Sequence, residues 1–100
     1  LPAMVDVQIA RDAFMAYRMS QAAERGVIIT GNGHARRDRG IPAFLQRARP
    51  EARIVVVTLL EGSKSQTAEE QIRQQATADV TDFALLTSAH PREDPCLAFQ

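Results

Sequence analysis

The chain is 100 residues long, which is the size of one domain or part of one. Hydrophobic residues make up 45%, charged residues 24%, and the formal net charge is zero, so no global charge favours nucleic acid or an acidic membrane surface. No apolar run approaches the ~20 residues of a membrane span. The single cysteine, Cys96, excludes a disulfide within the chain.

The first predicted element is a helix over residues 2–25, which Gly26 ends. One stripe of this helix carries Val5, Ile9, Ala16, Met19 and Ala23, with Gln8 and Asp12 inside the stripe. A carboxylate on a core-facing stripe is costly unless it is paired. Asp12 is therefore either a structural carboxylate, held by an arginine or by backbone N–H groups, or part of a site.

The opposite side of this helix is apolar as well, with Val7, Phe14 and Tyr17. A helix that is apolar on two sides touches two things. One should be the sheet, and the other a further segment, a second subunit or a ligand. Tyr17 is then an interface tyrosine, which is the commoner case, or an axial oxygen ligand for haem iron.

Residues 26–34 combine a short β-branched run with a turn and a histidine. The run predicts a buried parallel strand, and the turn follows at Gly31-Asn32-Gly33, whose residues tolerate φ > 0. His34 comes directly after it. Because ligands of open α/β sheets bind beyond the carboxyl ends of the strands, His34 is a candidate site residue. The alternative is a tight turn with an exposed histidine that has no role.

Three arginines lie close behind His34, namely Arg36, Arg37 and Arg39. Beside a strand end they could hold a phosphate or carboxylate by forked hydrogen bonds. The alternative is a solvated loop in which Asp38 is their internal partner.

The rest of the chain alternates helices and strands. We expect a helix over residues 41–49, a strand over 53–60, a helix over 67–78, a strand over 82–87 and an extended tail from residue 88. The strand-helix-strand order from Val27 to Leu60 implies a right-handed parallel crossover, which places Glu61 at the same sheet edge as His34. The fold class is α/β, of three-layer type, with a mostly parallel sheet of at least three strands. Too few helices cover it, so we expect part of a larger domain or an obligate partner.

Several common site motifs are missing from the sequence. It has no phosphate-binding loop, no Gly-x-Gly-x-x-Gly, no Gly-x-Ser-x-Gly and no Cys-x-x-Cys or His-x-x-x-His pair. A metal site made by this chain would need His34 and His90 to converge with Asp12 or Glu61, or ligands from outside the chain.

Three pieces of sequence together resemble one known family. They are Gln8-x-x-Arg11-Asp12-x-x-Met15-Ala16, Gly31-Asn32-Gly33-His34 followed by Gly40-Ile41-Pro42, and Arg92-Glu93-Asp94-Pro95-Cys96. Their order and spacing are similar to the C-terminal half of the ChaN-like haem-binding proteins, iron-regulated bacterial lipoproteins. A wider group with the Tiki proteases and erythromycin esterases shares paired Gly-x-x-His motifs.

The resemblance implies that residues 1–100 are a single α/β domain or the C-terminal half of a ChaN-like domain. It implies a homodimer, periplasmic or anchored to the outer membrane, with haem between the subunits. The site would contain His34 beside Asp12, with Asn32 in the same turn and Tyr17 as a candidate for the tyrosine that binds iron. The family's Gly-Glu-x-His motif is absent from this chain, so one histidine of the pair would lie elsewhere.

The function expected from these observations is haem binding in bacterial iron uptake. Phe14, Met15 and Met19 would cover the porphyrin, Tyr17 or His34 would meet the iron, and Arg36, Arg37 or Arg39 would pair with the propionates. One alternative is a hydrolase in which His34 and Asp12 or Glu61 hold a divalent metal that activates water. Another is a non-catalytic interaction module.

Overall fold

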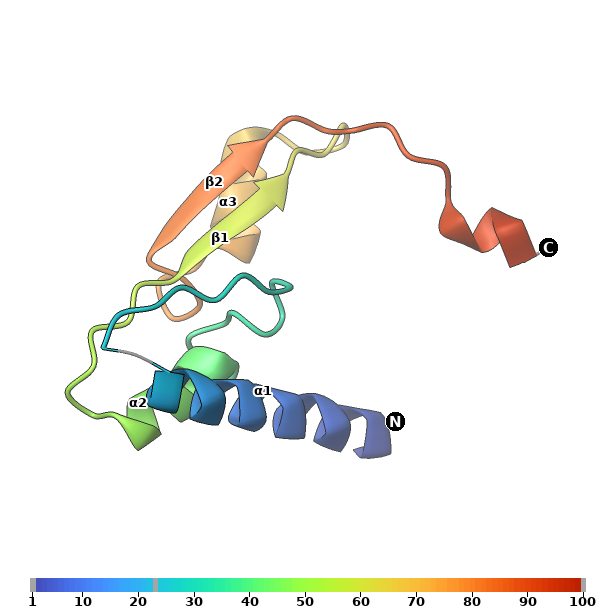
Figure 1. The fold of residues 1–100 in the computed structure, drawn as a ribbon. Coiled ribbons are helices and arrows are strands. Elements are labelled where there is room, and N and C mark those ends of the chain that lie inside the picture. Colours follow the sequence, from blue (N-terminus) through green and yellow to red (C-terminus); the bar gives the residue numbers. More distant parts are fainter. Residues whose placement is uncertain (1, 23, 100) are drawn as a thin grey trace.

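A computed structural model describes residues 2–22 and 24–99 as a mixed α/β chain. In chain order the elements are α1 (Pro2–Ala22), α2 (Ile41–Ala48), β1 (Val57–Glu61), α3 (Ala68–Gln75), β2 (Phe83–Thr87) and the 3-10 helix η1 (Pro95–Phe99). Figure 1 shows α1 beside α2 at one end, the two strands with α3 at the other, and a tail leading away to the C-terminus.

The two apolar stripes of helix α1 led us to expect contacts on both sides, one of them with the sheet, but among the described residues only one side is buried and it does not contact a strand. Val5 and Ile9, which belong to the stripe expected to be buried, are exposed. The buried side packs against α2 and contains Asp12 and Ala16. Val7, Phe14 and Tyr17 on the other side are exposed. The helix ends at Ala22, earlier than expected, and Ala23 of the predicted stripe lies outside the described residues.

The strands β1 and β2 pair in parallel, with Val57 opposite Phe83 and Glu61 opposite Thr87. Alternate side chains of β1 are buried, whereas Val57 and Leu59 on the other face are exposed. Helix α3 follows the N-cap Thr67, at which the helix was expected to begin, and Thr67 forms a capping box with Glu70. The helix contacts β2. The small number of predicted helices indicated too little cover for the strands, and among the described residues one face of the sheet is indeed open.

The strand expected at residues 26–30 is not formed. These residues are extended but belong to no ladder, and the side chain of Ile29 is 96% exposed. The described residues hold two paired strands, not three. The parallel crossover occurs between β1 and β2 through α3 instead of between residues 27 and 60. A β-branched run predicts an extended backbone, but a strand also needs a hydrogen-bonded neighbour.

The turn before His34 closes without a left-handed residue. The amide of His34 donates to the carbonyl of Gly31 at 3.0 Å, and that of Ala35 to the carbonyl of Asn32 at 3.2 Å. No described residue has a positive φ, so the glycines of this turn do not use the freedom that the sequence offered.

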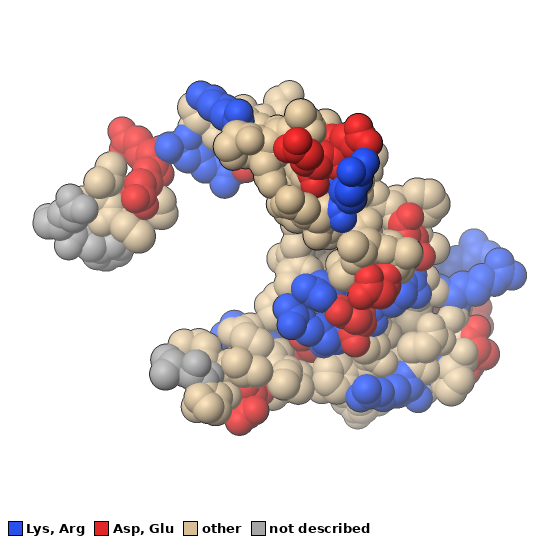
Figure 2. Space-filling view, turned by 180° about the vertical axis from the view of Figure 1, so that it is seen from behind, with Lys and Arg blue, Asp and Glu red and all other residues tan. Residues whose placement is uncertain are grey.

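Figure 2 shows a hollowed face between the arm that α1 forms and the arm that the tail forms, with acidic and basic side chains side by side.

The buried apolar side chains of the described residues are few: Ala16, Ile41, Val56 and Leu60. No helix within residues 2–22 and 24–99 has the length and hydropathy needed to cross a bilayer.

Candidate functional site

A histidine and an aspartate from different parts of the chain meet beside α1. The Nδ1 atom of His34 lies 2.5 Å from Oδ1 of Asp12. Asp12 is only 5% exposed, whereas 27% of the His34 side chain is exposed. A carboxylate on Nδ1 fixes the orientation of the imidazole and leaves Nε2 for another partner. This carboxylate–histidine arrangement is the one that supports many metal-binding histidines.

The loop that carries His34 is closed by hydrogen bonds at Gly40. The amide of Gly40 donates to the carbonyl of Arg36 at 2.8 Å, and that of Ile41 donates to the carbonyl of His34 at 2.7 Å. A Cβ atom at residue 40 would stand 2.2 Å from the His34 carbonyl oxygen. Only glycine allows the backbone of His34 to approach the start of α2 this closely.

A cavity of about 550 Å³ lies next to the His34–Asp12 pair. Its apolar lining comes from Val5, Ile9 and Phe44, and its basic lining from Arg39 and Arg47. The guanidinium carbon of Arg47 lies 5.5 Å from the centroid of the Phe44 ring, within range of a cation–π contact. The volume is in the range of small-molecule sites, roughly 300–1,000 Å³.

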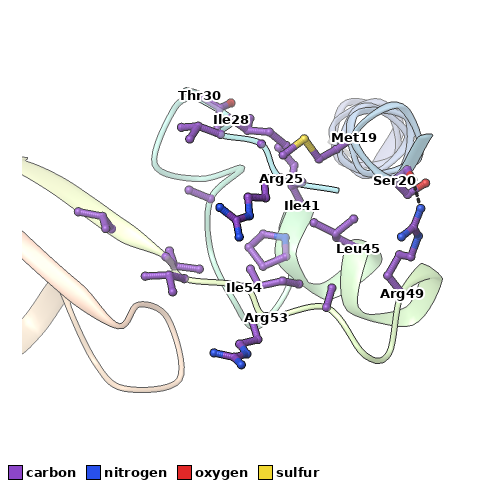
Figure 3. Close-up of a pocket in the computed structure, with 18 of the residues that line it drawn as sticks. Met19, Ser20, Arg25, Ile28, Thr30, Ile41, Leu45, Arg49, Arg53 and Ile54 are labelled. Carbon is purple, nitrogen blue, oxygen red and sulfur yellow. Dashed lines mark hydrogen bonds between the residues drawn. The ribbon is translucent and has the colours of Figure 1, made fainter. Parts of the chain in front are cut away.

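A second cavity, of about 600 Å³, lies between the end of α1, α2 and the segment before β1 (Figure 3). Met19, Ile28, Ile41, Leu45 and Ile54 line it, and Arg49 spans its edge by donating to the Ser20 carbonyl at 2.7 Å. Its described lining contains no histidine, cysteine or aspartate. The cavity at His34 is therefore the candidate site, although it is the smaller one.

Two of the predicted ligand-binding arginines are engaged within the protein. Arg36 donates to both carboxylate oxygens of Asp38, at 2.8 and 2.6 Å. This pair raises the pKa of Arg36 and lowers the pKa of Asp38. Arg37 pairs with Asp82 and donates to the carbonyl of Ile54 at 3.2 Å. The alternative that Asp38 is an internal partner of this run therefore applies to Arg36.

Two other candidates, Asn32 and Glu61, are not among the residues that line the cavity at His34. The side-chain amide of Asn32 donates to the backbone carbonyl of Leu59 at 3.0 Å and so connects the turn to β1. The carboxylate of Glu61 accepts from the His90 amide at 2.7 Å and from Arg92 at 3.0 Å. The described part of the chain contains no group of three or more His, Cys, Asp or Glu side chains that could hold a metal ion.

Tyr17 lies on the opposite side of α1 from Asp12. Tyr17 is 55% exposed, and its hydroxyl accepts a hydrogen bond from the side-chain amide of Gln21 at 2.9 Å. Five residues along a helix correspond to a rotation of about 140°, so one chain does not bring Tyr17 and His34 together. The three residues expected to cover a porphyrin also separate, because Phe14 faces outward and Met19 lines the other cavity.

Sequence reasoning missed the contribution of α2 to the site. Phe44 and Arg47 are spaced by three residues, which places them on one face of that helix. The sequence predicted the helix, but nothing in it placed this face beside the helix that carries Asp12.

Comparison with known proteins bears on the first part of the chain. Residues 1–45 match the model of a family described as "Haem-binding uptake, Tiki superfamily, ChaN". The resemblance is thus confirmed over the stretch that contains Asp12, Tyr17, His34 and Gly40. The third piece of the resemblance, around Cys96, lies outside the matched residues. No curated protein and no solved structure matches the chain.

Proposed function

We propose, from the family match over residues 1–45, that this chain binds haem in bacterial iron uptake, with His34 at the iron. The observation that carries the proposal is the hydrogen bond from His34 to the buried carboxylate of Asp12. A histidine held in this way keeps one ring nitrogen for a metal and has a fixed tautomer. The histidine, the aspartate and the turn between them all lie within the matched residues.

The residues around His34 fit a haem group. A porphyrin needs apolar walls for its faces, a ligand for its iron and cations for its carboxylates. The cavity supplies apolar side chains at Val5, Ile9 and Phe44 and guanidinium groups at Arg39 and Arg47. Its volume of about 550 Å³ suits a ligand of this class. The bound group supplies an iron that His34 would hold, and in uptake the haem itself is the cargo.

A subunit interface would complete this site. Because Tyr17 and His34 lie on different sides of α1, a tyrosine could meet the same iron only from a second copy of the chain. Val7, Phe14 and Tyr17 form an exposed apolar side of α1 that such a copy would cover. We include in the proposal a homodimer that holds haem between its subunits.

The proposal also covers the larger protein and its location. Residues 26–30 would join β1 as a third strand once the rest of a ChaN-like domain is present. Residues 1–100 would then be the C-terminal half of that domain. The family likeness further leads us to propose a periplasmic protein or one anchored to the outer membrane.

A metal-dependent hydrolase is the second candidate, because His34 and Asp12 could equally hold a divalent ion. Against it, Glu61 is engaged by the tail, so only two donors meet. Further ligands would have to come from outside the described residues. The third possibility, a non-catalytic interaction module, would use the same exposed apolar surfaces without any role for His34.

Titration of the purified chain with ferric haem tests the choice. Haem binding predicts a saturable shift of the Soret band, together with no tightly bound divalent metal by elemental analysis. Bound metal and peptidase activity without a Soret shift would favour the hydrolase. If the chain binds neither haem nor a metal, the result would favour the non-catalytic interaction module.

A further inference from the structure

Two arginines that line the His34 cavity, Arg39 and Arg47, make no ion pair among the described residues, although the charge of Arg39 helps to lower the pKa of the Asp38 carboxyl, which also lines the cavity. Among the described residues, the arginines that form ion pairs are Arg36, Arg37, Arg73 and Arg92. Arg49 is engaged differently, with the Ser20 carbonyl. Arg39 and Arg47 take part in no ion pair, and both line the cavity that His34 opens into.

The positions of these two arginines follow from α2. Arg39 directly precedes Gly40, the N-cap of the helix, and Arg47 lies in its last turn. Seven residues separate Gly40 from Arg47, about 10 Å along the axis, so the two arginines mark opposite ends of this short helix. The Phe44 ring beneath Arg47 helps to hold that guanidinium at the cavity.

The acidic groups near these arginines are already engaged. The carboxylate of Asp38 is bound through both oxygens by Arg36, and that of Asp12 is bound by His34. The cavity therefore combines the guanidinium groups of Arg39 and Arg47 with the apolar side chains of Val5, Ile9 and Phe44. This chemistry suits a flat apolar ligand that carries carboxylates.

We infer that Arg39 and Arg47 recognise the propionate carboxylates of haem, while the arginines engaged with Asp38 and Asp82 do not. This inference rests on the proposed haem site and assigns the groups that orient the porphyrin there. A guanidinium binds a carboxylate through two parallel hydrogen bonds, which fixes direction as well as adding affinity. Arg39 and Arg47 are then the residues that distinguish haem from porphyrins without free acid groups.

Affinities for two ligands test this assignment, namely ferric protoporphyrin IX and its dimethyl ester, which keeps the ring and iron but lacks the carboxylates. The wild-type chain should bind the free acid on the order of 10-fold or more tightly than the ester. Arg39→Gln and Arg47→Gln should each reduce that preference, and the double variant should abolish it while leaving ester affinity unchanged. Arg53→Gln, which removes the same charge at the other cavity, is the matched control.

The outcomes separate this inference from the haem proposal. Equal wild-type affinity for acid and ester, or an unchanged preference in the double variant, would overturn the arginine assignment and leave haem binding standing. Binding of neither ligand would overturn both. Thermal unfolding followed by circular dichroism shows whether each variant is folded. If a glutamine variant does not fold, the lysine variants Arg39→Lys and Arg47→Lys replace it. A weakened preference for the free acid over the ester is again expected, because lysine lacks the planar guanidinium fork.

Discussion

Burial of the Asp12 carboxylate in α1 carries a desolvation cost that its hydrogen bond to His34 has to offset. The pair therefore serves two purposes at once. It satisfies a buried acid on the packed side of the helix, and it orients an imidazole at the edge of a cavity. The structural and the site hypotheses for Asp12 are in this sense compatible.

Asp12→Asn should weaken haem binding without unfolding the chain. The amide keeps the shape of the side chain but holds the imidazole less strongly, and such changes typically reduce metal affinity by about 10–100-fold. Haem titration monitored at the Soret band measures the effect. Asp6→Asn, at an exposed position of the same helix, is the control and should bind like wild type. Equal affinity of Asp12→Asn and wild type would remove the orienting role.

Gly40→Ala should destabilise the loop that carries His34. The new methyl group would stand 2.2 Å from the His34 carbonyl oxygen and 2.8 Å from that of Arg36, so the backbone would have to move. Overpacking of this kind costs typically about 1–3 kcal/mol. Urea unfolding measures the loss, and Gly33→Ala, where nothing lies within 4 Å of the added Cβ, is the control. Equal stability of the two variants would show that the loop relaxes freely.

At the scale of residues, two of the candidates that the sequence singled out are brought together by the structure. The helical stripe singled out Asp12, and the turn after a β-branched run singled out His34. The sequence offered Asp38 as an internal partner, which holds for Arg36, whereas the pairing of Arg37 with Asp82 depends on a long-range placement that no local pattern reports. Arg47 was missed because its role depends on the packing of α2 beside α1.

An ion pair and several hydrogen bonds join the His34 loop to the segments beside the strands. The Arg37 side chain pairs with Asp82, which lies just before β2. The backbone amide of Arg37 donates to the Val80 carbonyl at 2.9 Å. The Asp82 carboxylate also accepts from the Val56 amide at 2.7 Å. The loop that positions His34 is thereby fixed to the end of the sheet at which β1 begins.

Stability should fall in acid partly because of Asp82. Its pKa is lowered by the Val56 N–H and, secondarily, by Arg37. A carboxyl with a lowered folded-state pKa stabilises the fold above its ordinary value of ~3.9, and this contribution is lost as the pH falls through the lowered value. Asp82→Asn should be less stable than wild type at neutral pH and lose less stability on acidification from about pH 5.

Urea unfolding at several pH values measures this dependence. The Asp38 carboxyl, whose pKa Arg36 lowers, leaves a residual pH dependence in the Asp82→Asn variant. Glu93→Gln in the tail is the control and should follow the wild-type curve. If Asp82→Asn loses stability in acid as steeply as wild type does, Asp82 is not part of the acid response.

Element prediction succeeded where local signals were complete. Helix α3 begins directly after Thr67, where a helix was predicted to start, and α2 begins at Ile41 as predicted. Strand β2 begins at Phe83, one residue later than predicted. The run at residues 26–30 failed because β propensity describes how a residue fits a sheet, and the described residues provide no neighbouring strand there. Strand pairing is a long-range property that a short apolar run does not encode.

The molecule as a whole leaves large apolar side chains uncovered. Phe14 on α1 is 62% exposed, and Leu59 and Phe83 lie on the open face of the sheet. Patches of this kind mark surfaces that contact something else. The sequence anticipated this shortage of cover from the small number of helices, and the structure places the uncovered surfaces on α1 and on one face of the sheet.

Haem should convert the chain from monomer to dimer if α1 forms the proposed interface. Phe14→Glu places a charge in the centre of that surface and should keep the haem-loaded chain monomeric. Val27→Glu, a matched change at an exposed residue outside α1, should still dimerise. Sedimentation velocity with and without haem measures the mass. A wild-type chain that binds haem and still sediments as one copy would contradict the interface.

The affinity of ferric haem for His34→Ala, compared with wild type and with His90→Ala, tests the central claim most directly. His90 is the other histidine of the chain, and its backbone amide donates to the Glu61 carboxylate. It is not among the residues that line the His34 cavity. The account predicts roughly 10-fold or greater weakening for His34→Ala, with an altered Soret band, and wild-type affinity for His90→Ala. Wild-type affinity and an unchanged Soret band for both variants would contradict it.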